Sequence, residues 1–377
     1  MRGFFYCDIL FLYTHMGLFS NEPTSIVGVD LGASSVKLVE LKPFRNQMQL
    51  ITYAYSEGKI VVPNDEEGKL QLQAELLKYV AAKAKLTSKK AVASVPLSDV
   101  FSAIVRVPVV NKKDQTAIIQ AEASKFLPFP YSEAVVDWKV IPSPKKVPVA
   151  NSDVDNYVNQ EKEQSVLITA APKSTVNRIA EIFKRAGLQL QSLETEAFAL
   201  TRSLIGNDPT STLLVDIGAV RSNFFVVENS IPVMHRSMQL GGINFTAALD
   251  KVFGVGLDKA EIMKADMMEA GAIEAGMSGF PKIFETTISP LINEIRYTMN
   301  LYTTQQRGTK PERIILTGGS ARLPHLDDYL MKTFNLKVFV GDPWARVWYA
   351  EDLRPTLYDV GNRFAVAIGL ALRDSMK

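Results

Sequence analysis

The sequence contains one seven-residue pattern twice, first as Val29-Asp30-Leu31-Gly32-Ala33-Ser34-Ser35 and again as Val215-Asp216-Ile217-Gly218-Ala219-Val220-Arg221. The two aspartates lie 186 residues apart (216 − 30 = 186). A pattern that recurs at about the length of a domain indicates two related domains in one chain.

Each copy of the pattern lies between two short apolar segments: 26–29 and 36–41 flank the first, and 213–215 and 224–227 flank the second. The order of strand, tight turn and strand predicts a β-hairpin. In a P-loop or a Rossmann site the glycine turn opens a helix instead, and the chain contains neither GxxxxGK[ST] nor GxGxxG. Those two nucleotide-binding folds are therefore disfavoured.

The composition is that of an ordinary globular protein. The chain has 377 residues, of which 47% are hydrophobic and 22% are charged, and this length predicts two or three domains. The formal net charge is only +2, and no basic stripe points to nucleic acid or to an anionic membrane as the main partner. The single cysteine, Cys7, excludes an intramolecular disulfide, and the three scattered histidines do not form a metal-binding pattern.

The first fifteen residues do not read as part of the fold. Their apolar run from Phe4 to Tyr13 is too short to span a bilayer and lacks a small-residue cleavage site. Met16 is therefore interpreted as the natural start, and residues 1–15 as a non-native or disordered extension. No other stretch of the sequence is long and apolar enough to span a bilayer, so we expect the protein to insert into no membrane directly.

The remaining segments alternate between strand-like and helical patterns. The predicted helices are 68–84, 116–126, 175–186, 245–253, 259–264 and 363–372, and the predicted strands are 92–95, 102–107, 135–141, 166–170 and 313–316. Residues 142–164 and 267–280 are interpreted as loops. A further helix is predicted around 288–299, provided that Pro290 falls in its first turn.

The repeated pattern suits a phosphate site. In each copy an aspartate ends an apolar strand, and a glycine two positions later lets backbone N–H groups approach phosphate oxygens closely. Asp30 and Asp216 are then expected to hold Mg²⁺, through water, because a phosphate-bound magnesium ion commonly takes one or two carboxylates and keeps several waters. The plainer interpretation is a pair of ordinary hairpins with aspartate-initiated turns.

Two later segments add to the pattern. Gly318-Gly319-Ser320 follows an apolar strand and leaves room for a flat base or a ribose above the backbone. Glu261 and Lys264 lie three residues apart on a predicted helix, so they share a face and either pair with each other or meet ribose hydroxyls. The residues alone leave this choice open.

In this order, the two DxG hairpins, the AExxK segment and the Gly-Gly turn resemble the ATPase pattern shared by actin, sugar kinases, Hsp70 chaperones and the cell-division protein FtsA. The match covers nearly the whole chain from Ile26 onward. Within this superfamily, residues 122–133 (EASKFLPFPYSE) and 288–296 (ISPLINEIR) resemble segments of the PilM family of type IV pilus assembly proteins.

The resemblance implies an α/β actin-like fold, in which two ribonuclease-H-like domains flank a nucleotide cleft and a small FtsA-like subdomain is inserted. The first domain would comprise 16–94 and 172–205, with the insert at 95–171. The second would comprise 206–360, and 361–377 would form a closing helix.

The resemblance also implies a cofactor, ATP with Mg²⁺, and assigns residues to it. Contacts to the phosphates, ribose and base are expected from Asp30, Gly32, Ala33, Ser34, Ser35, Lys37, Asp216, Gly218, Ala219, Gly241, Gly242, Glu261, Lys264, Gly318, Gly319 and Ser320.

Catalysis is the least defined part of the pattern. Glu196 matches a water-orienting glutamate of the superfamily, but Ala197 stands where the family pattern has proline. The alternative is a surface glutamate at the start of a helix over 196–204. Slow ATP hydrolysis or none is expected.

The resemblance further implies a cytoplasmic adaptor that is peripheral to the inner membrane. Its partner would be the N-terminal tail of a PilN-like inner-membrane pilus protein, and self-association is a further expectation. The alternative function is that of a filament-forming cytoskeletal ATPase similar to FtsA or MreB.

Overall fold

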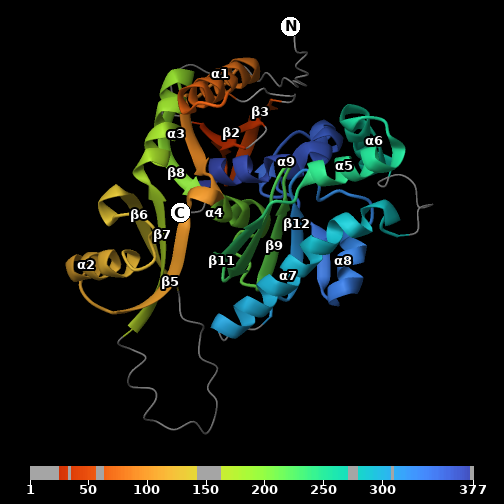
Figure 1. Cartoon of the computed structure of the whole chain (residues 1–377). Coiled ribbons are helices and arrows are strands. Elements are labelled where there is room, and N and C mark those ends of the chain that lie inside the picture. The colour runs from red at the N-terminus through yellow and green to blue at the C-terminus, as the bar shows by residue number, and fades with distance from the viewer. Residues whose placement is uncertain are drawn as a thin grey trace. The chain divides into compact units, whose positions relative to one another are not determined.

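The computed structural model describes residues 25–32, 35–56, 63–141, 163–270, 279–306 and 310–373 (Figure 1). The chain divides into two compact units: one is formed by the residues up to Ser94 together with those from Ile182 onward, and the other by Val95–Glu181. The expected extension at 1–15 and most of the expected loop at 142–164 lie outside the described residues.

The first unit contains two sheets. The first has the strand order β14-β3-β2-β1-β4-β8. Its strands are β1 (Ile26–Leu31), β2 (Val36–Phe44), β3 (Gln47–Tyr55), β4 (Lys90–Val95), β8 (Gln189–Thr195) and β14 (Val347–Trp348). Strands β1, β2 and β3 form an antiparallel meander, and β4 joins β1 in parallel.

The second sheet repeats this arrangement, with the order β11-β10-β9-β12-β13. Its strands are β9 (Thr212–Ile217), β10 (Ser222–Glu228), β11 (Ile231–Met238), β12 (Arg313–Thr317) and β13 (Lys337–Val340). Strands β9, β10 and β11 again form a meander, and β12 again joins the first strand in parallel. The repeated sequence pattern therefore corresponds to a repeated topology.

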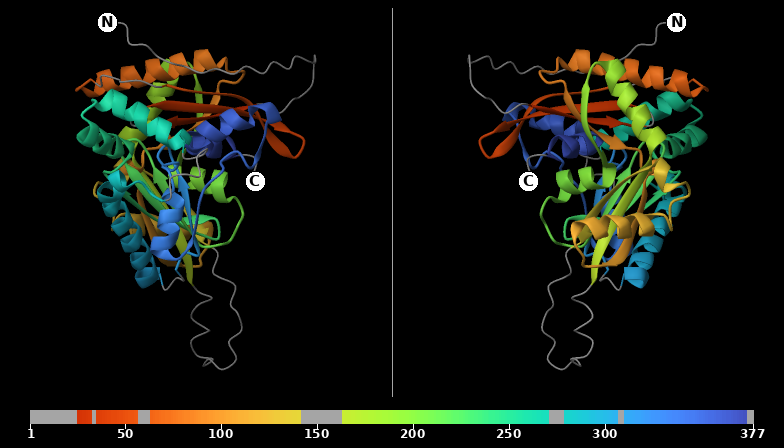
Figure 2. Two further views of the ribbon diagram at one scale, coloured as in Figure 1. Left: turned by 90° about the vertical axis from the view of Figure 1, so that its right-hand side faces the viewer. Right: turned by 90° about the vertical axis from the view of Figure 1, so that its left-hand side faces the viewer.

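Helix α9 (Arg354–Ala371) packs directly on β1 of the first sheet. It begins nine residues before the expected start at Arg363, because Pro355 occupies a first-turn position where its missing N–H has no intrahelical acceptor. In Figure 2, α9 lies on one side of the first sheet and helix α1 (Glu66–Ala84) on the other. Around α9 the buried aromatic rings of Tyr53, Trp344 and Phe364 meet edge to face or at a tilt.

The other helices of the first unit follow the expected apolar spacing with shifted ends, except the last of them, which was not predicted. They are α3 (Lys173–Ala186, whose first turns belong to the second unit), α4 (Glu196–Leu200), α5 (Gly242–Phe253), α6 (Leu257–Ala270), α7 (Glu285–Gln306) and α8 (Leu326–Phe334). A π-helical turn, Thr201–Ile205, continues α4.

Two expectations about this unit are wrong. Residues 267–270, expected as loop, form the last turn of α6, because Met and Ala are good helix formers that outweigh the nearby glycines. Pro290 is the sixth residue of α7 rather than a first-turn residue. It is tolerated because it lies on the exposed side of the helix, where water can satisfy the carbonyl that loses its partner.

The second unit is a three-stranded sheet of order β5-β7-β6 with one helix against it. Its elements are β5 (Phe101–Pro108), α2 (Lys112–Ala123), β6 (Ala134–Ile141) and β7 (Glu163–Pro172). The unit runs past Ala171 to Glu181 because the first turns of α3 belong to it. There, Thr175 donates a hydrogen bond to Asp99 at 2.9 Å.

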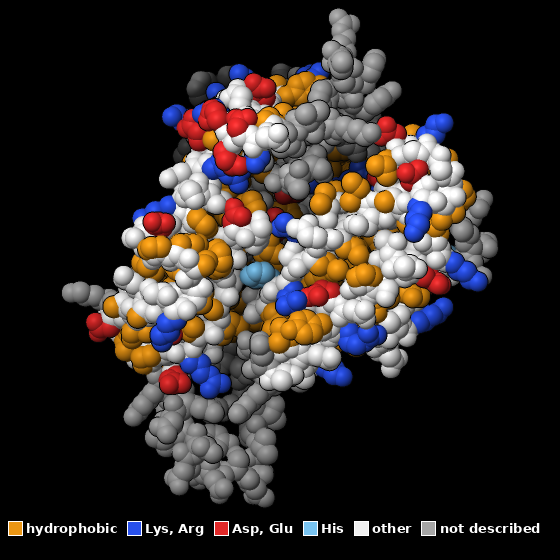
Figure 3. Space-filling view, in the orientation of Figure 1, with side chains coloured by type: hydrophobic (Ala, Val, Ile, Leu, Met, Phe, Trp, Pro, Cys, Tyr) orange, Lys and Arg blue, Asp and Glu red, His pale blue; other side chains and the backbone are white. Residues whose placement is uncertain are grey.

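The surface offers no sign of a membrane span among the described residues, since no helix there is long and apolar enough to cross a bilayer. On the face drawn in Figure 3, side chains of both charges are intermixed. This pattern agrees with the small net charge of the sequence.

Candidate functional site

The first hairpin places Asp30 at the end of β1, where it pairs across the ladder with Lys37 on β2. The Lys37 ammonium donates to Asp30 Oδ2 at 3.1 Å, and Asp30 is only 8% exposed. Gly32 lies in the turn, where a Cβ would come within 3.1 Å of the Ser35 carbonyl oxygen. Ala33 and Ser34, at the tip of the expected phosphate loop, lie outside the described residues.

The second hairpin is built in the same way. Asp216 pairs across the β9–β10 ladder with Asn223. The turn is closed by the Gly218 N–H, which donates to the Arg221 carbonyl at 3.0 Å.

Two further glycine turns are joined to this second hairpin. The N–H groups of Gly242 and Ile243 donate to the carbonyls of Gly218 and Ala219, each at 2.9 Å. Gly241 approaches so closely that a Cβ there would lie 2.7 Å from the Ala219 carbonyl. The Gly241–Gly242 turn therefore needs glycine at its first position.

The Gly318-Gly319-Ser320 turn reaches the hairpin from β12. The Ser320 N–H donates to the Ile217 carbonyl at 3.1 Å. Gly318 has φ = 87°, and a Cβ there would lie 2.5 Å from Asp216 Oδ1. Both the positive φ and the close approach require glycine. The structure thus brings three of the expected motifs together around Asp216.

Glu196 begins α4 and is half-buried near both aspartates rather than free on the surface. Burial, and then the neighbouring charges of Asp30 and Asp216, raise the pKa of Glu196 to about 8. Burial and the Asp30 carboxylate likewise raise the pKa of Asp216 to about 6. The carboxyl groups of Asp30, Asp216 and Glu196 therefore influence one another electrostatically, with Lys37 and Arg221 as the cations that act on Glu196.

In the structure Glu261 and Lys264 pair with each other at 2.7 Å, which is one of the two arrangements that the sequence leaves open. The buried Lys264 ammonium also donates to the Gly242 carbonyl at 3.0 Å and to Thr246 Oγ1 at 2.8 Å. All three of its N–H donors are then used within the protein. Burial lowers the pKa of Lys264. The Glu261 side chain is 59% exposed.

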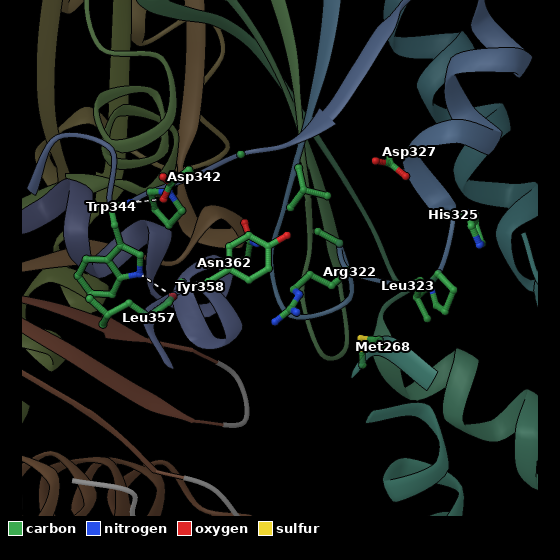
Figure 4. A pocket seen from close by; sticks show the side chains of 16 residues that line it. Met268, Arg322, Leu323, His325, Asp327, Asp342, Trp344, Leu357, Tyr358 and Asn362 are labelled. Atoms are coloured by element: carbon green, nitrogen blue, oxygen red, sulfur yellow. Dashed lines mark hydrogen bonds between the residues drawn. The ribbon is translucent and has the colours of Figure 1, made fainter. Parts of the chain in front are cut away.

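A pocket of about 200 Å³ opens beside the Gly-Gly turn (Figure 4). Met268 from α6, Leu323 and Arg322 from the segment after the turn, and Tyr358 from α9 line it. The Arg322 guanidinium lies 5.0 Å from the centre of the Tyr358 ring and pairs with Asp359 at 3.0 Å. The lining of the pocket mixes apolar and polar side chains, and the Tyr358 ring and the Arg322 guanidinium offer flat surfaces.

Sequence reasoning missed Met268, Arg322, Tyr358, Asn223 and Ser237. Asn223 could have been found, because it occupies the same position in the second copy of the repeat as Lys37 does in the first. The pocket residues could not have been found in this way, since four separate segments contribute them.

The carboxylates of the site suit Mg²⁺ only in part. Among the described residues no group of three His, Cys, Asp or Glu side chains is placed to hold a metal ion by itself. The Asp30 and Asp216 carboxylates nevertheless fit an ion that keeps most of its waters and binds phosphate, because one or two carboxylates suffice for such an ion. The site therefore fits Mg²⁺ that arrives with a nucleotide, not an all-protein metal cage.

Comparisons with known proteins agree with this architecture. One chain of the solved PilM-PilN type IV pilus biogenesis complex superimposes with a TM-score of 0.75 at 23% identity, covering 94% of this chain and 99% of that chain. Ethanolamine utilization protein EutJ from Carboxydothermus hydrogenoformans gives a TM-score of 0.52 at 16% identity, covering 93% and 90%. Cell division protein FtsA from Enterococcus faecalis is 23% identical over 347 residues, which are 83% of this chain and 78% of that protein.

These likenesses confirm the predicted actin-like α/β fold. The family model described as type IV pilus assembly protein PilM matches residues 28–375, nearly the whole chain. The chain therefore belongs to the PilM family of type IV pilus assembly proteins.

Proposed function

We propose that the chain binds Mg²⁺-ATP between its two hairpins and uses this binding to control an adaptor surface for pilus assembly. The observation that carries the proposal is that the Gly241–Gly242 turn and the Gly318–Ser320 turn both meet the second hairpin at Asp216. The equivalent Asp30 of the first hairpin contributes to the raised pKa of Asp216. Neighbouring carboxylates repel each other, and a divalent cation relieves this repulsion.

In this proposal the backbone N–H groups of the two hairpin turns bind the phosphates, with Lys37 beside the first turn. The 318–320 turn and the pocket beside it hold the nucleoside, and the exposed carboxylate of Glu261 is placed for ribose hydroxyls. Lys264 contributes indirectly, because its three hydrogen bonds hold the Gly242 turn in place. Bound Mg²⁺ would neutralise phosphate charge.

Glu196 is the candidate for orienting a hydrolytic water. Its raised pKa of about 8 means that most of it is protonated at neutral pH before nucleotide binds. A protonated carboxyl is a poor proton acceptor, which supports slow hydrolysis.

For the adaptor role we propose a PilN-like partner. The matched structural relative is a complex of PilM with PilN, and the present chain would hold the N-terminal cytoplasmic tail of such an inner-membrane protein. The second compact unit supports this role, because its sheet has two edge strands, β5 and β6, and exposes Val135 and Val140. An extended tail can add to such an edge through main-chain hydrogen bonds. The chain would then be cytoplasmic and peripheral to the inner membrane through its partner.

We expect Mg²⁺-ATP to tighten the binding of a PilN-like tail peptide by about 5- to 150-fold, the usual range of coupling between two sites. Fluorescence titration of the full chain with the labelled peptide, with and without Mg²⁺-ATP, measures this factor. The peptide should tighten ATP binding by the same factor, since coupling is reciprocal.

The control for this titration is a pair of Asp-to-Ala variants. Asp216→Ala should bind the tail with one affinity whether or not Mg²⁺-ATP is present, whereas Asp352→Ala, at an exposed position, should behave like the parent. Equal tail affinity in the parent with and without Mg²⁺-ATP contradicts the adaptor proposal. Sedimentable assemblies formed by the chain alone with Mg²⁺-ATP would instead favour the filament alternative.

A further inference from the structure

The two hairpins differ in the residue that faces the aspartate. In the first, Lys37 lies opposite Asp30 and its ammonium donates to the carboxylate at 3.1 Å. In the second, the equivalent position holds Asn223, whose Nδ2 lies 3.4 Å from Asp216 Oδ2. A charged partner in one repeat is thus replaced by a neutral one in the other.

Asn223 also reaches a second carboxylate. Its Nδ2 lies 3.4 Å from Glu196 Oε2, so one amide spans Glu196 and Asp216. The Ser237 hydroxyl donates to the amide oxygen of Asn223, so the NH₂ end of the amide is the end that faces the two carboxyl groups. The two contacts are long for hydrogen bonds, which leaves the carboxylate oxygens free to take further partners.

Ser237 on β11 fixes the other end of this amide. Its hydroxyl donates to Asn223 Oδ1 at 2.8 Å, and Asn223 is only 7% exposed. A buried side chain held at one end has little freedom to turn its NH₂ away from the two acids. The order of contacts therefore runs from Ser237 through Asn223 to Asp216 and Glu196.

We propose that Asn223, oriented by Ser237, is a positioning residue that holds the Asp216 and Glu196 carboxylates side by side toward the Mg²⁺ that accompanies the nucleotide. This inference rests on the proposed function. An amide can hold Asp216 beside Glu196 without adding a positive charge, whereas the ammonium of Lys37 offsets part of the charge of Asp30. The second hairpin thereby keeps its negative charge for a divalent cation.

The test compares ATP affinity measured by calorimetry with Mg²⁺ and with EDTA, and the ratio of the two is the Mg²⁺ enhancement. Asn223→Lys should place an ammonium opposite Asp216 and reduce the enhancement on the order of tenfold, which equals about 1.4 kcal/mol. Ser237→Ala should give a smaller reduction, because it releases the amide without removing it. Ser237→Thr keeps the hydroxyl and should restore the parent ratio.

Matched controls are Asn300→Lys and Ser289→Ala, both at exposed positions on α7, which should keep the parent ratio. Thermal unfolding without nucleotide shows that each variant is folded. An unchanged enhancement in Asn223→Lys, or equal effects of Ser237→Ala and Ser237→Thr, overturns the inference alone. A parent chain that binds no ATP with or without Mg²⁺ overturns the proposed function, and this inference with it.

Discussion

Gly28→Ala should destabilise the first unit by about 3 kcal/mol or more, since overpacking in a tight core commonly costs about 1–3 kcal/mol and sometimes more. Gly28 lies on β1 against α9, and an added Cβ would sit 1.9 Å from the Ala367 carbonyl oxygen and 2.7 Å from the Ala371 nitrogen. These two atoms are a donor and an acceptor four residues apart in the same helix. Because both are backbone atoms, no rotamer change can relieve the clash.

Urea unfolding measures the change in free energy. Gly319→Ala is the control, because its Cβ would approach only the Arg363 side chain, at 3.9 Å. An unfolding free energy of Gly28→Ala within about 1 kcal/mol of the parent would contradict the packing of α9 on β1.

Between pH 6 and pH 8 the deprotonation of Glu196 should lower the unfolding free energy of the nucleotide-free protein by about 2 kcal/mol. A fully shifted group gives a slope of about 1.36 kcal/mol per pH unit, and the partial exposure of Glu196 reduces this value. The pKa of Glu196 is raised from 4.5 to about 8 on folding. The native state therefore binds the proton more tightly, so this contribution is complete below pH 4.5 and is lost as pH rises through about 8. The raised pKa of Asp216 also stabilises the native state at low pH. Because this pKa is only about 6, the contribution of Asp216 is lost at a lower pH than that of Glu196.

Glu196→Gln should flatten this pH dependence, because glutamine does not titrate. Burial lowers the pKa of His235, which gives an opposite slope below about pH 6.5, so the parent and the variant are compared as a difference. Glu312→Gln, at an exposed position, is the control and should keep the parent profile. Parallel profiles of the parent and Glu196→Gln from pH 6 to pH 8 would place Glu196 outside the carboxylate cluster.

Much of the fold could be predicted from the repeat. An apolar strand, an aspartate and a glycine turn are local features, and they recur in β1–β2 and β9–β10 as the sequence indicates. The ends of the helices and strands were harder to predict, because they depend on the packing around them. Pro290 is tolerated inside α7 because it faces solvent. The spacing of apolar residues in the sequence does not show how many residues of the helix precede this proline.

The parts of the candidate site that a single segment forms could be predicted from the sequence. The parts where several segments meet could not. The glycine turns at 218, 241–242 and 318–320 could be named from the sequence, and the structure brings them together. The contact of Asn223 with Glu196 joins residues 27 positions apart in sequence and depends on how α4 meets the second sheet. Neither propensity nor spacing carries that information.

The central claim, that the two hairpins form one Mg²⁺-ATP site, is tested most directly by titration calorimetry of ATP into the parent, Asp30→Ala and Asp216→Ala in the presence of Mg²⁺. We expect micromolar binding by the parent, and in each variant a loss of about 1.5–3 kcal/mol, the range for hydrogen bonds to charged groups. Both losses should appear, since each hairpin contributes its own carboxylate. Parent-like ATP binding by both variants would contradict the account.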